Sequence, residues 1–199
     1  QVLRAGGVVL YPTDTLYGLG ADAFSDEAVA KVYEIKGREE KKPIHCIVAD
    51  VEMAERYGKF NDTARILAKE FWPGSLTIVV EKKSGVKSGI GHRIKTIGIR
   101  IPKNDFCLAL AKEFGKPYTT TSANVSSAAS KRSVDNILAQ IGKMTSQIEL
   151  VIDAGELPQS EPSTIVDVSG TKPIILREGA IAASEIWNVL GAEPRSESA

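Results

Sequence analysis

Two periods of hydrophobicity alternate along this chain. Short apolar runs of strand length recur throughout, and between them apolar residues return every three or four positions, as in amphipathic helices. Capping residues and glycines mark the ends of the helical segments. Strand and helix patterns in this alternation predict an α/β fold, in which helices cover a buried sheet.

The predicted strands are apolar runs bounded by polar or turn residues; they cover 8–11, 44–48, 76–80, 97–101, a stretch near Tyr118, 150–152, 164–168 and 174–176. The predicted helices carry an apolar stripe; one is capped by Ser25 and ends at Gly37, one runs from Asn61 to about Trp72, and the others cover 106–114, 134–141 and 183–190.

One loop, 154–162, is rich in Pro and Glu and lies between two predicted strands. We expect those strands to belong to one sheet, so we interpret the loop as a mobile edge of a site rather than as a linker. The chain is therefore predicted to form one domain over residues 1–191. The polar residues 192–199 are expected to form a disordered tail.

Charge and composition exclude several classes of protein. The 199 residues hold 25 Lys plus Arg and 25 Asp plus Glu, and 43% of them are hydrophobic. This balance is typical of a globular domain and excludes a disordered chain or a uniformly basic nucleic-acid coat protein, although not a local basic patch. No apolar run approaches the ~18 residues of a membrane span.

The two cysteines, Cys46 and Cys107, form no Cys-x-x-Cys pair, and we do not expect a structural zinc site. A single disulfide between them is left open by the sequence. We prefer two buried free thiols in a cytoplasmic protein, because disulfides are rare in reducing compartments.

Positive charge gathers in two places. Seven Lys and Arg and no acid fall between Lys82 and Asn104, and a second basic group surrounds the end of the first predicted helix. Such segregation favours an anionic ligand such as phosphate, carboxylate or RNA. The alternative is a solvated surface, which we prefer for Lys82, Lys83 and Lys87, in an expected hairpin loop.

Arg100 is different because it lies inside a predicted strand. In 97–101 the alternation places Arg100 on the same face as Gly98 and opposite the isoleucines. A charge in such a strand needs an anion, either internal or bound.

A polar loop follows the first predicted strand, in 11–20. Two threonines flank an aspartate there, and two glycines permit close approach of the backbone to a ligand. Because ligands of α/β sheets bind beyond the carboxyl ends of strands, this loop could orient a small polar substrate. An ordinary polar turn is the alternative.

Three further segments could carry chemistry. Lys36 and Arg38 either stabilise the negative end of a helix or converge with Lys42 on a polyphosphate. Residues 119–126 carry hydroxyls and a carboxamide before a predicted helix, where they form an anion site at its N-terminus or simply cap it. The last segment is 163–167.

Together and in this order, the segments resemble the YrdC/Sua5/TsaC family, the threonylcarbamoyl-AMP synthases of tRNA modification. The resemblance extends from about residue 6 to residue 181 and is closest to the single-domain form of the family. Its motifs match at 12–19, 36–38, 71–74, 122–124, 163–167 and 176–181.

The resemblance implies a twisted mixed sheet flanked by helices around a deep, positively charged cavity. It implies a nucleotidyltransferase that joins L-threonine, bicarbonate and ATP into threonylcarbamoyl-adenylate and releases pyrophosphate, with Mg²⁺ carried by ATP. The adenylate would serve formation of N6-threonylcarbamoyladenosine at tRNA position 37, through a separate transferase complex.

The resemblance also implies roles for single residues. Lys36 and Arg38 would be catalytic, through positioning and charge neutralisation. The residues that would bind ATP are Arg38, Lys42, Thr96, Asn124 and Arg177. Those that would bind L-threonine are Thr15, Arg100, Ser122 and Ser163, and no residue is assigned to a metal.

Two positions depart from the family pattern. Glu39 stands where many relatives have Pro, and Ser127 stands where the family usually has Gly. The role of the divergent segment 127–133 is therefore left open, whereas the reaction class is unaffected.

Two other interpretations are kept beside this one. A double-stranded RNA or tRNA binder without catalysis would use the basic run from Lys82 to Lys103 to contact phosphates. A carbamoyl-transfer domain like that of hydrogenase maturation proteins would share the fold. Those proteins carry Cys-rich zinc modules for which two cysteines are too few, although the residues alone do not exclude a carbamoyl phosphate substrate.

Overall fold

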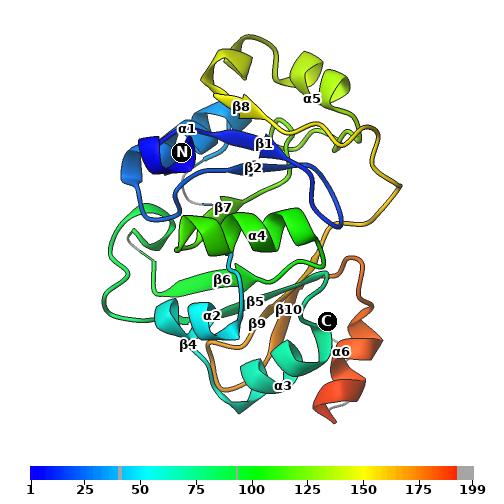
Figure 1. Ribbon diagram of the computed structural model, residues 1–199. Helices are drawn as coiled ribbons and strands as arrows, with labels where there is room; N and C mark the ends of the chain where they lie inside the picture. The colour runs from blue at the N-terminus through cyan, green and yellow to red at the C-terminus, as the bar shows by residue number, and fades with distance from the viewer. Residues whose placement is uncertain (40–41, 93, 192–199) are drawn as a thin grey trace.

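The computed structural model describes residues 1–39, 42–92 and 94–191 as an α/β domain (Figure 1). Glu40, Lys41, Arg93 and the tail predicted over 192–199 lie outside the described residues. Within the described ranges, no helix is long and apolar enough to span a membrane.

The strands form two sheets. One has the order β2-β1-β8, and the other has the order β10-β9-β5-β6-β3-β7 with β4 paired to β5. The strands are β1 Val9–Tyr11, β2 Gly18–Gly20, β3 His45–Ile47, β4 Gly58–Lys59, β5 Leu76–Lys82, β6 Thr96–Arg100, β7 Tyr118–Thr120, β8 Leu150–Val151, β9 Thr164–Asp167 and β10 Ile174–Arg177.

Both sheets are mixed. In the larger one β3 runs parallel to β6 and β5 runs parallel to β9, whereas β5 and β6 pair antiparallel, as do β3 and β7. In the smaller one β1 pairs antiparallel with β2 and parallel with β8. The predicted class, a twisted mixed sheet flanked by helices, is confirmed.

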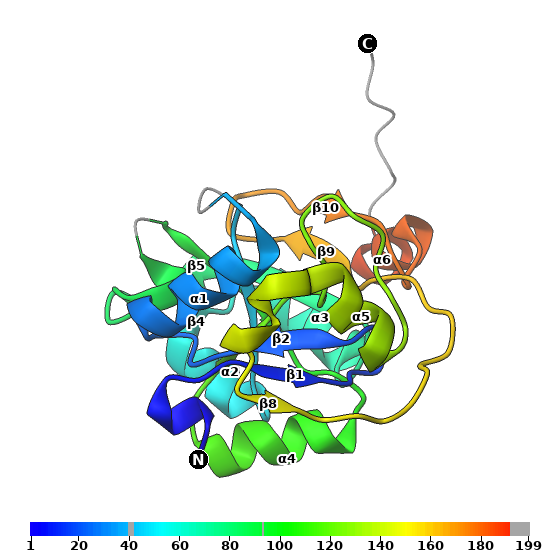
Figure 2. The ribbon, with the colours of Figure 1, turned by 90° about the horizontal axis from the view of Figure 1, so that it is seen from above.

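The expectation that the strands on either side of 154–162 share a sheet is wrong. β8 pairs with β1, whereas β9 pairs with β5, so the loop crosses from one sheet to the other. Figure 2 shows this segment, in yellow, running along the outside of the molecule after β8. The two sheets also meet directly, because Leu19 N donates to Thr121 O at 2.9 Å and Ala123 N donates to Tyr17 O at 2.8 Å.

The helices are set by local signals near their ends. Ser25, Asn61 and Asn104 each accept a hydrogen bond from a backbone N–H of the first turn that follows, and Gly37 ends the first helix with φ 54°. The helices are α1 Asp26–Lys36, α2 Val51–Tyr57, α3 Asp62–Phe71, α4 Asp105–Phe114, α5 Val134–Ile141 and α6 Ala183–Leu190, with short 3₁₀ helices η1 Leu3–Ala5, η2 Gly89–Gly91 and η3 Gly142–Gln147.

Two apolar clusters hold the layers together. The larger one joins α1, α2, α3, α5 and α6 to the sheets. The smaller one packs α4 against β1, β3 and β7, and Figure 1 shows α4 lying across the sheet on this side. Cys46 and Cys107 are buried free thiols, as preferred from the sequence.

The helix predicted over 134–141 is confirmed, but a loop separates it from residues 119–126. α5 begins only at Val134, and no side chain caps it at Ser133. Residues 121–133 therefore form a long loop, and neither a helix N-terminal anion site nor helix capping explains Ser122 and Asn124. Their hydrogen bonds lie within this loop and with Lys36, as described below.

Candidate active site

A pocket of about 230 Å³ lies between the loop after β1, the loop after β7 and one face of the larger sheet. Its described lining includes three arginines and one histidine and no Asp or Glu, so its charge suits an anionic ligand. The lining residues are Thr13, Thr15, Leu16, Tyr17, Gly18, Arg38, Pro43, Ile44, His45, Thr77, Arg100, Thr120, Thr121, Ser122, Ser130, Pro162, Ser163, Ile165 and Arg177.

The floor of the pocket follows from strand register. Arg100 pairs with Thr77, Thr77 with Ile165, and Ile165 with Arg177, so one row of cross-strand partners crosses β6, β5, β9 and β10. Partners in register project from the same face of a sheet. The two arginines of the row therefore rise from opposite ends of one strip of the floor.

Because the sheet is mixed, the pocket is not confined to the carboxyl ends of its strands. Arg100 ends β6 and the loop with Thr15 follows β1, as the sequence led us to expect. His45 and Thr77, however, lie near the amino ends of β3 and β5.

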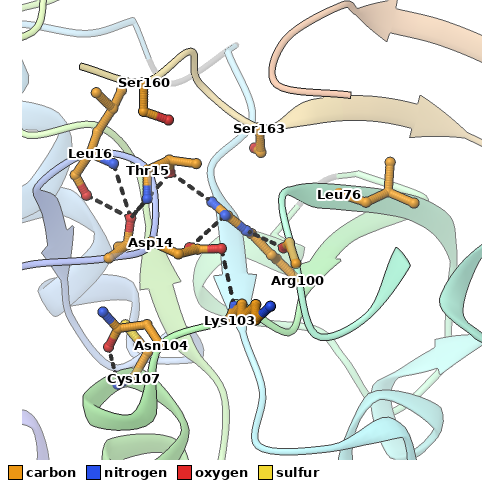
Figure 3. Close-up of polar contacts among 12 residues, drawn as sticks. Asp14, Thr15, Leu16, Leu76, Arg100, Lys103, Asn104, Cys107, Ser160 and Ser163 are labelled. Atoms are coloured by element: carbon orange, nitrogen blue, oxygen red, sulfur yellow. Dashed lines mark hydrogen bonds and ion pairs between the residues drawn. The ribbon is translucent and has the colours of Figure 1, made fainter. Parts of the chain in front are cut away.

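Arg100 has an internal anion partner (Figure 3). Its Nη2 donates to Asp14 Oδ1 at 2.6 Å, its Nη1 donates to Thr15 Oγ1 at 3.1 Å, and its Nε donates to Gly74 O at 3.0 Å. The side chains of Arg100 and Asp14 are 5% and 11% exposed. The charge predicted to need an anion is thus paired within the protein.

The loop after β1 is ordered by its own side chains and is more than an ordinary polar turn. Thr13 Oγ1 accepts from the backbone N–H groups of Thr15 and Leu16 and donates to Leu16 O at 2.7 Å. Asp14 Oδ2 accepts from Lys103 N at 3.1 Å. These bonds fix the Thr15 hydroxyl beside Arg100, at the wall of the pocket.

Lys36 lies beneath the loop after β7 and is absent from the pocket lining. Its Nζ donates to Ser122 O at 2.5 Å, to Asn124 O at 2.8 Å and to Asn124 Oδ1 at 3.2 Å. Three acceptors match the three N–H groups of an ammonium ion. Burial, and then the charge of Arg38, lowers the pKa of Lys36 to about 7. In this geometry Lys36 positions the loop, and its predicted place among the phosphates stays a prediction.

Ser122 and Asn124 are joined to each other. Ser122 Oγ donates to Asn124 Oδ1 at 2.5 Å, and Asn124 Nδ2 donates to Ala128 O at 2.5 Å. Ser122 lines the pocket, whereas Asn124 is buried behind it. The structure therefore brings the predicted threonine contact to the pocket and leaves the predicted ATP contact in the supporting loop.

Arg38 reaches the pocket from the turn after α1. Its Nε donates to Lys42 O at 3.2 Å and its Nη2 donates to Pro43 O at 3.0 Å. The side chains of Lys42 and Thr96 are not in the lining, since Lys42 is exposed and Thr96 begins β6 at the end opposite Arg100. Their predicted contacts with ATP stay predictions.

Arg177 and Ser163 form the far wall. Arg177 Nη2 donates to Ser163 O at 2.6 Å and to Ser163 Oγ at 3.3 Å, and the Ser163 hydroxyl lies 3.1 Å from Thr77 Oγ1. Burial, and then the charges of Arg100 and Arg38, lowers the pKa of Arg177. The positive charges of Arg100 and Arg38 therefore disfavour the charged form of Arg177.

Sequence reasoning assigned no role to several residues of this pocket, among them His45, Thr77 and Tyr17. The alternation that singled out Arg100 in 97–101 also applies to 44–48 and 76–80, and it could have placed His45 and Thr77 on one sheet face. Tyr17 had no such signal, because its role depends on a distant loop.

Tyr17 fastens the start of the loop 154–162. Its hydroxyl donates to Gly155 O at 2.8 Å and accepts from Ala154 N at 2.9 Å. Further along, Leu157 N donates to Arg132 O at 2.9 Å, and Arg132 forms an ion pair with Glu156. The loop expected to be a mobile edge is thus tied to both the loop after β1 and the divergent segment 127–133.

A model of the Sua5/YciO/YrdC family, described as "Telomere recombination", matches residues 1–179. The chain belongs to the Sua5/YciO/YrdC family. The resemblance stated from the sequence motifs is therefore confirmed.

Relatives in the Sua5/YciO/YrdC family extend this result. A protein of Methanocaldococcus jannaschii, provisionally named a threonylcarbamoyl-AMP synthase, is 40% identical over 181 residues, which are 91% of this chain and 84% of that protein. The threonylcarbamoyl-AMP synthase of Pyrococcus abyssi is 36% identical over 191 residues, 95% of this chain. The chain spans about half the length of the P. abyssi protein, 55%.

A solved Sua5/YciO/YrdC structure supports the fold. The crystal structure of P. abyssi Sua5 complexed with L-threonine has a TM-score of 0.86 and 34% sequence identity to this chain, and the match covers 96% of this chain and 55% of that one. The roles of single residues in the present chain stay predictions.

Proposed function

We propose that this chain is an L-threonylcarbamoyladenylate synthase, a nucleotidyltransferase that uses L-threonine, bicarbonate and ATP and releases pyrophosphate. The names of its relatives and the L-threonine complex of P. abyssi Sua5 support this proposal. The observation in the chain itself that carries it is the pocket with three arginines and no carboxylate in its described lining. Both ATP and an amino-acid carboxylate need such charge.

L-Threonine fits beside Arg100. A guanidinium group has five N–H donors, of which Arg100 uses three on Gly74, Thr15 and Asp14. The remaining two can hold the threonine carboxylate. The hydroxyls of Thr15 and Ser163 lie on the same lining and can bind the polar groups of threonine.

The ATP phosphates fit between Arg38 and Arg177, which reach the pocket from α1 and β10. A polyphosphate there would relieve the mutual repulsion of the guanidinium groups. Bidentate contacts to phosphate are the chemistry for which Arg is best suited. Lys36 would act indirectly, because it holds the backbone of Ser122 and Asn124.

The reaction then balances in two steps. The threonine amine adds to CO₂ derived from bicarbonate and loses a proton, which gives a carbamate. A carbamate oxygen attacks the α-phosphorus of ATP in line, and the bond to pyrophosphate breaks. Positioning and charge neutralisation by the arginines would supply the catalysis, and burial of the labile product in the pocket would slow its hydrolysis.

Mg²⁺ is expected to enter with ATP. The described residues hold no group of three or more His, Cys, Asp or Glu that could bind an ion, so the phosphate oxygens would be its main ligands. It would neutralise phosphate charge. The adenylate would pass to a separate transferase complex that modifies adenosine 37 of tRNA, in the cytoplasm.

An RNA-binding module without catalysis is the less favoured alternative. Lys82, at the start of the basic run, is engaged within the hairpin, because its Nζ donates to Val86 O and Gly91 O at 2.6 Å each. This agrees with a structural role for that lysine. The pocket, moreover, suits small anions better than it suits a flat RNA surface.

Pyrophosphate release tests the proposal. We expect release from Mg-ATP only when L-threonine and bicarbonate are both present, and loss of release when any one of the three is omitted. Release without threonine, or no release together with salt-sensitive RNA binding, would overturn the synthase proposal in favour of another activity.

A further inference from the structure

His45 lies on the floor of the pocket but has no role in the function proposed above. It begins β3 and pairs with Thr120 of β7, while on its other side the register of β3 and β6 places it beside Gly98. A Cβ at Gly98 would stand 2.3 Å from Cδ2 and 2.8 Å from Cγ of His45. The imidazole therefore lies across the backbone of Gly98 and occupies the space that a side chain at that position would need.

Among the described residues, the charged groups that act on the pKa of His45 are arginines. Arg177 faces it from β10 and Arg38 from the turn after α1, while Arg100 follows on β6. The neighbour on β7, Thr120, is uncharged, and no carboxylate stands in the described lining. Burial, and then the charges of Arg177 and Arg38, lowers the pKa of His45 to about 4. The lowered pKa favours the neutral imidazole when no anion is bound.

This arrangement changes when an anion binds. A polyphosphate between Arg38 and Arg177 cancels the positive charge that disfavours imidazolium. It also offers oxygen acceptors to the ring, and hydrogen bonds of imidazolium to phosphate are charge-assisted. An imidazole between two arginines is therefore suited to gain a proton together with its ligand.

We propose that His45 is a further contact of the ATP triphosphate and that it takes up a proton when the triphosphate binds. The inference rests on the proposed function only in naming ATP as the ligand. The underlying chemistry is that of a polyphosphate, so inorganic tripolyphosphate is a probe that requires no turnover.

The test is a direct titration of His45 by NMR. The chain has two histidines, and the other, His92, is exposed, so a His92→Gln variant leaves one imidazole signal. Its Cε1–H resonance is followed from about pH 3 to 8 without ligand, with saturating Mg-ATP and with tripolyphosphate. We expect the midpoint to rise by about three pH units with either ligand, which makes the bound ring largely cationic at pH 6.

The kinetic arm uses His45→Gln, which keeps a side-chain N–H but cannot become a cation. We expect its KM for ATP to rise roughly tenfold near pH 6, with kcat and the KM for threonine little changed. Circular dichroism and the melting temperature verify that the variant is folded.

The outcomes separate the two proposals. An unchanged midpoint with bound ligand, or an unchanged KM for ATP in His45→Gln, overturns the role of His45 while pyrophosphate release by the wild type still supports the synthase. Absence of pyrophosphate release with a normal midpoint shift on tripolyphosphate overturns the synthase and keeps His45 as a polyphosphate contact. If neither ligand binds, both proposals fail.

Discussion

The guanidinium of Arg100 and the carboxylate of Asp14 form a buried ion pair, with 2.6 Å between Nη2 and Oδ1. The pair joins the end of β6 to the loop after β1 and also holds Thr15 beside the guanidinium. Asp14 thereby orients the guanidinium of Arg100 while two N–H donors of that guanidinium are left available. It acts as a positioning residue for the predicted threonine site.

Replacing Asp14 by Asn should therefore affect stability and substrate binding together. Loss of one member of a buried pair leaves the other uncompensated, and we expect a decrease of about 3 kcal/mol in the free energy of unfolding. The KM for threonine should rise more than the KM for ATP. Urea denaturation and steady-state kinetics measure both.

A matched control is Glu81→Gln, which removes an exposed ion pair with Lys59 far from the threonine contacts. It should cost less than about 1 kcal/mol because exposed pairs are screened by solvent. Equal losses of stability in the two variants would contradict the special role of the Asp14 pair.

Lys36 makes folding stability depend on pH. The folded chain releases the Lys36 proton near pH 7, whereas the ordinary pKa of 10.5 applies to the unfolded chain. Between these values the unfolded chain binds more protons, so the stability of the wild type should rise with pH. Relative to Lys36→Met, the increase should approach about 1.4 kcal/mol per pH unit. Chemical denaturation of both proteins at pH 7, 8 and 9 measures it, and a constant difference would refute the lowered pKa.

Gly98 should be required for the position of the His45 ring, because only glycine leaves room for it. A methyl group at Gly98 would collide with the imidazole, so Gly98→Ala should displace the ring and raise the KM for ATP roughly tenfold. In the double variant Gly98→Ala with His45→Ala the collision is gone. Its KM should match that of His45→Ala alone, and fully additive effects would argue against the contact.

The hydroxyl of Tyr17 should control the loop 154–162. Tyr17→Phe removes the bonds to Ala154 and Gly155, and we expect faster amide hydrogen exchange at Ala154, whose N–H donates to that hydroxyl. Tyr57→Phe, whose ring stacks on Phe24 elsewhere, is the control. Identical exchange in the two variants would show that the Tyr17 hydroxyl does not hold the loop.

Local signals explain which elements could be predicted from the sequence. The helix between Ser25 and Gly37 has a side-chain cap and a left-handed glycine, and both act within a few residues. β2, Gly18–Gly20, had no such signal, because glycine disfavours strands. It is a strand because of its neighbour: a Cβ at Gly20 would stand 2.8 Å from the ring of Tyr11, so glycine lets the two strands pack.

The sequence indicated several residues of the pocket lining but not the contacts between them. The need of Arg100 for an anion followed from burial, but its partner Asp14 is 86 positions away and only the fold brings them together. The resemblance singled out Lys36, Ser122 and Asn124 together. It could not show that the ammonium lies beneath that loop, with its donors already engaged.

The residues that line the pocket come from both ends of the described chain. Thr13 follows the first strand, and Arg177 ends the last one. No partial fold can therefore bind the substrates, because their binding surface exists only when strands of great sequence separation have assembled. Contacts between residues far apart in sequence form slowly during folding. A ligand that binds only the folded domain stabilises that domain by mass action. Protection of the chain from proteolysis by threonine or ATP would thus report completion of the entire domain.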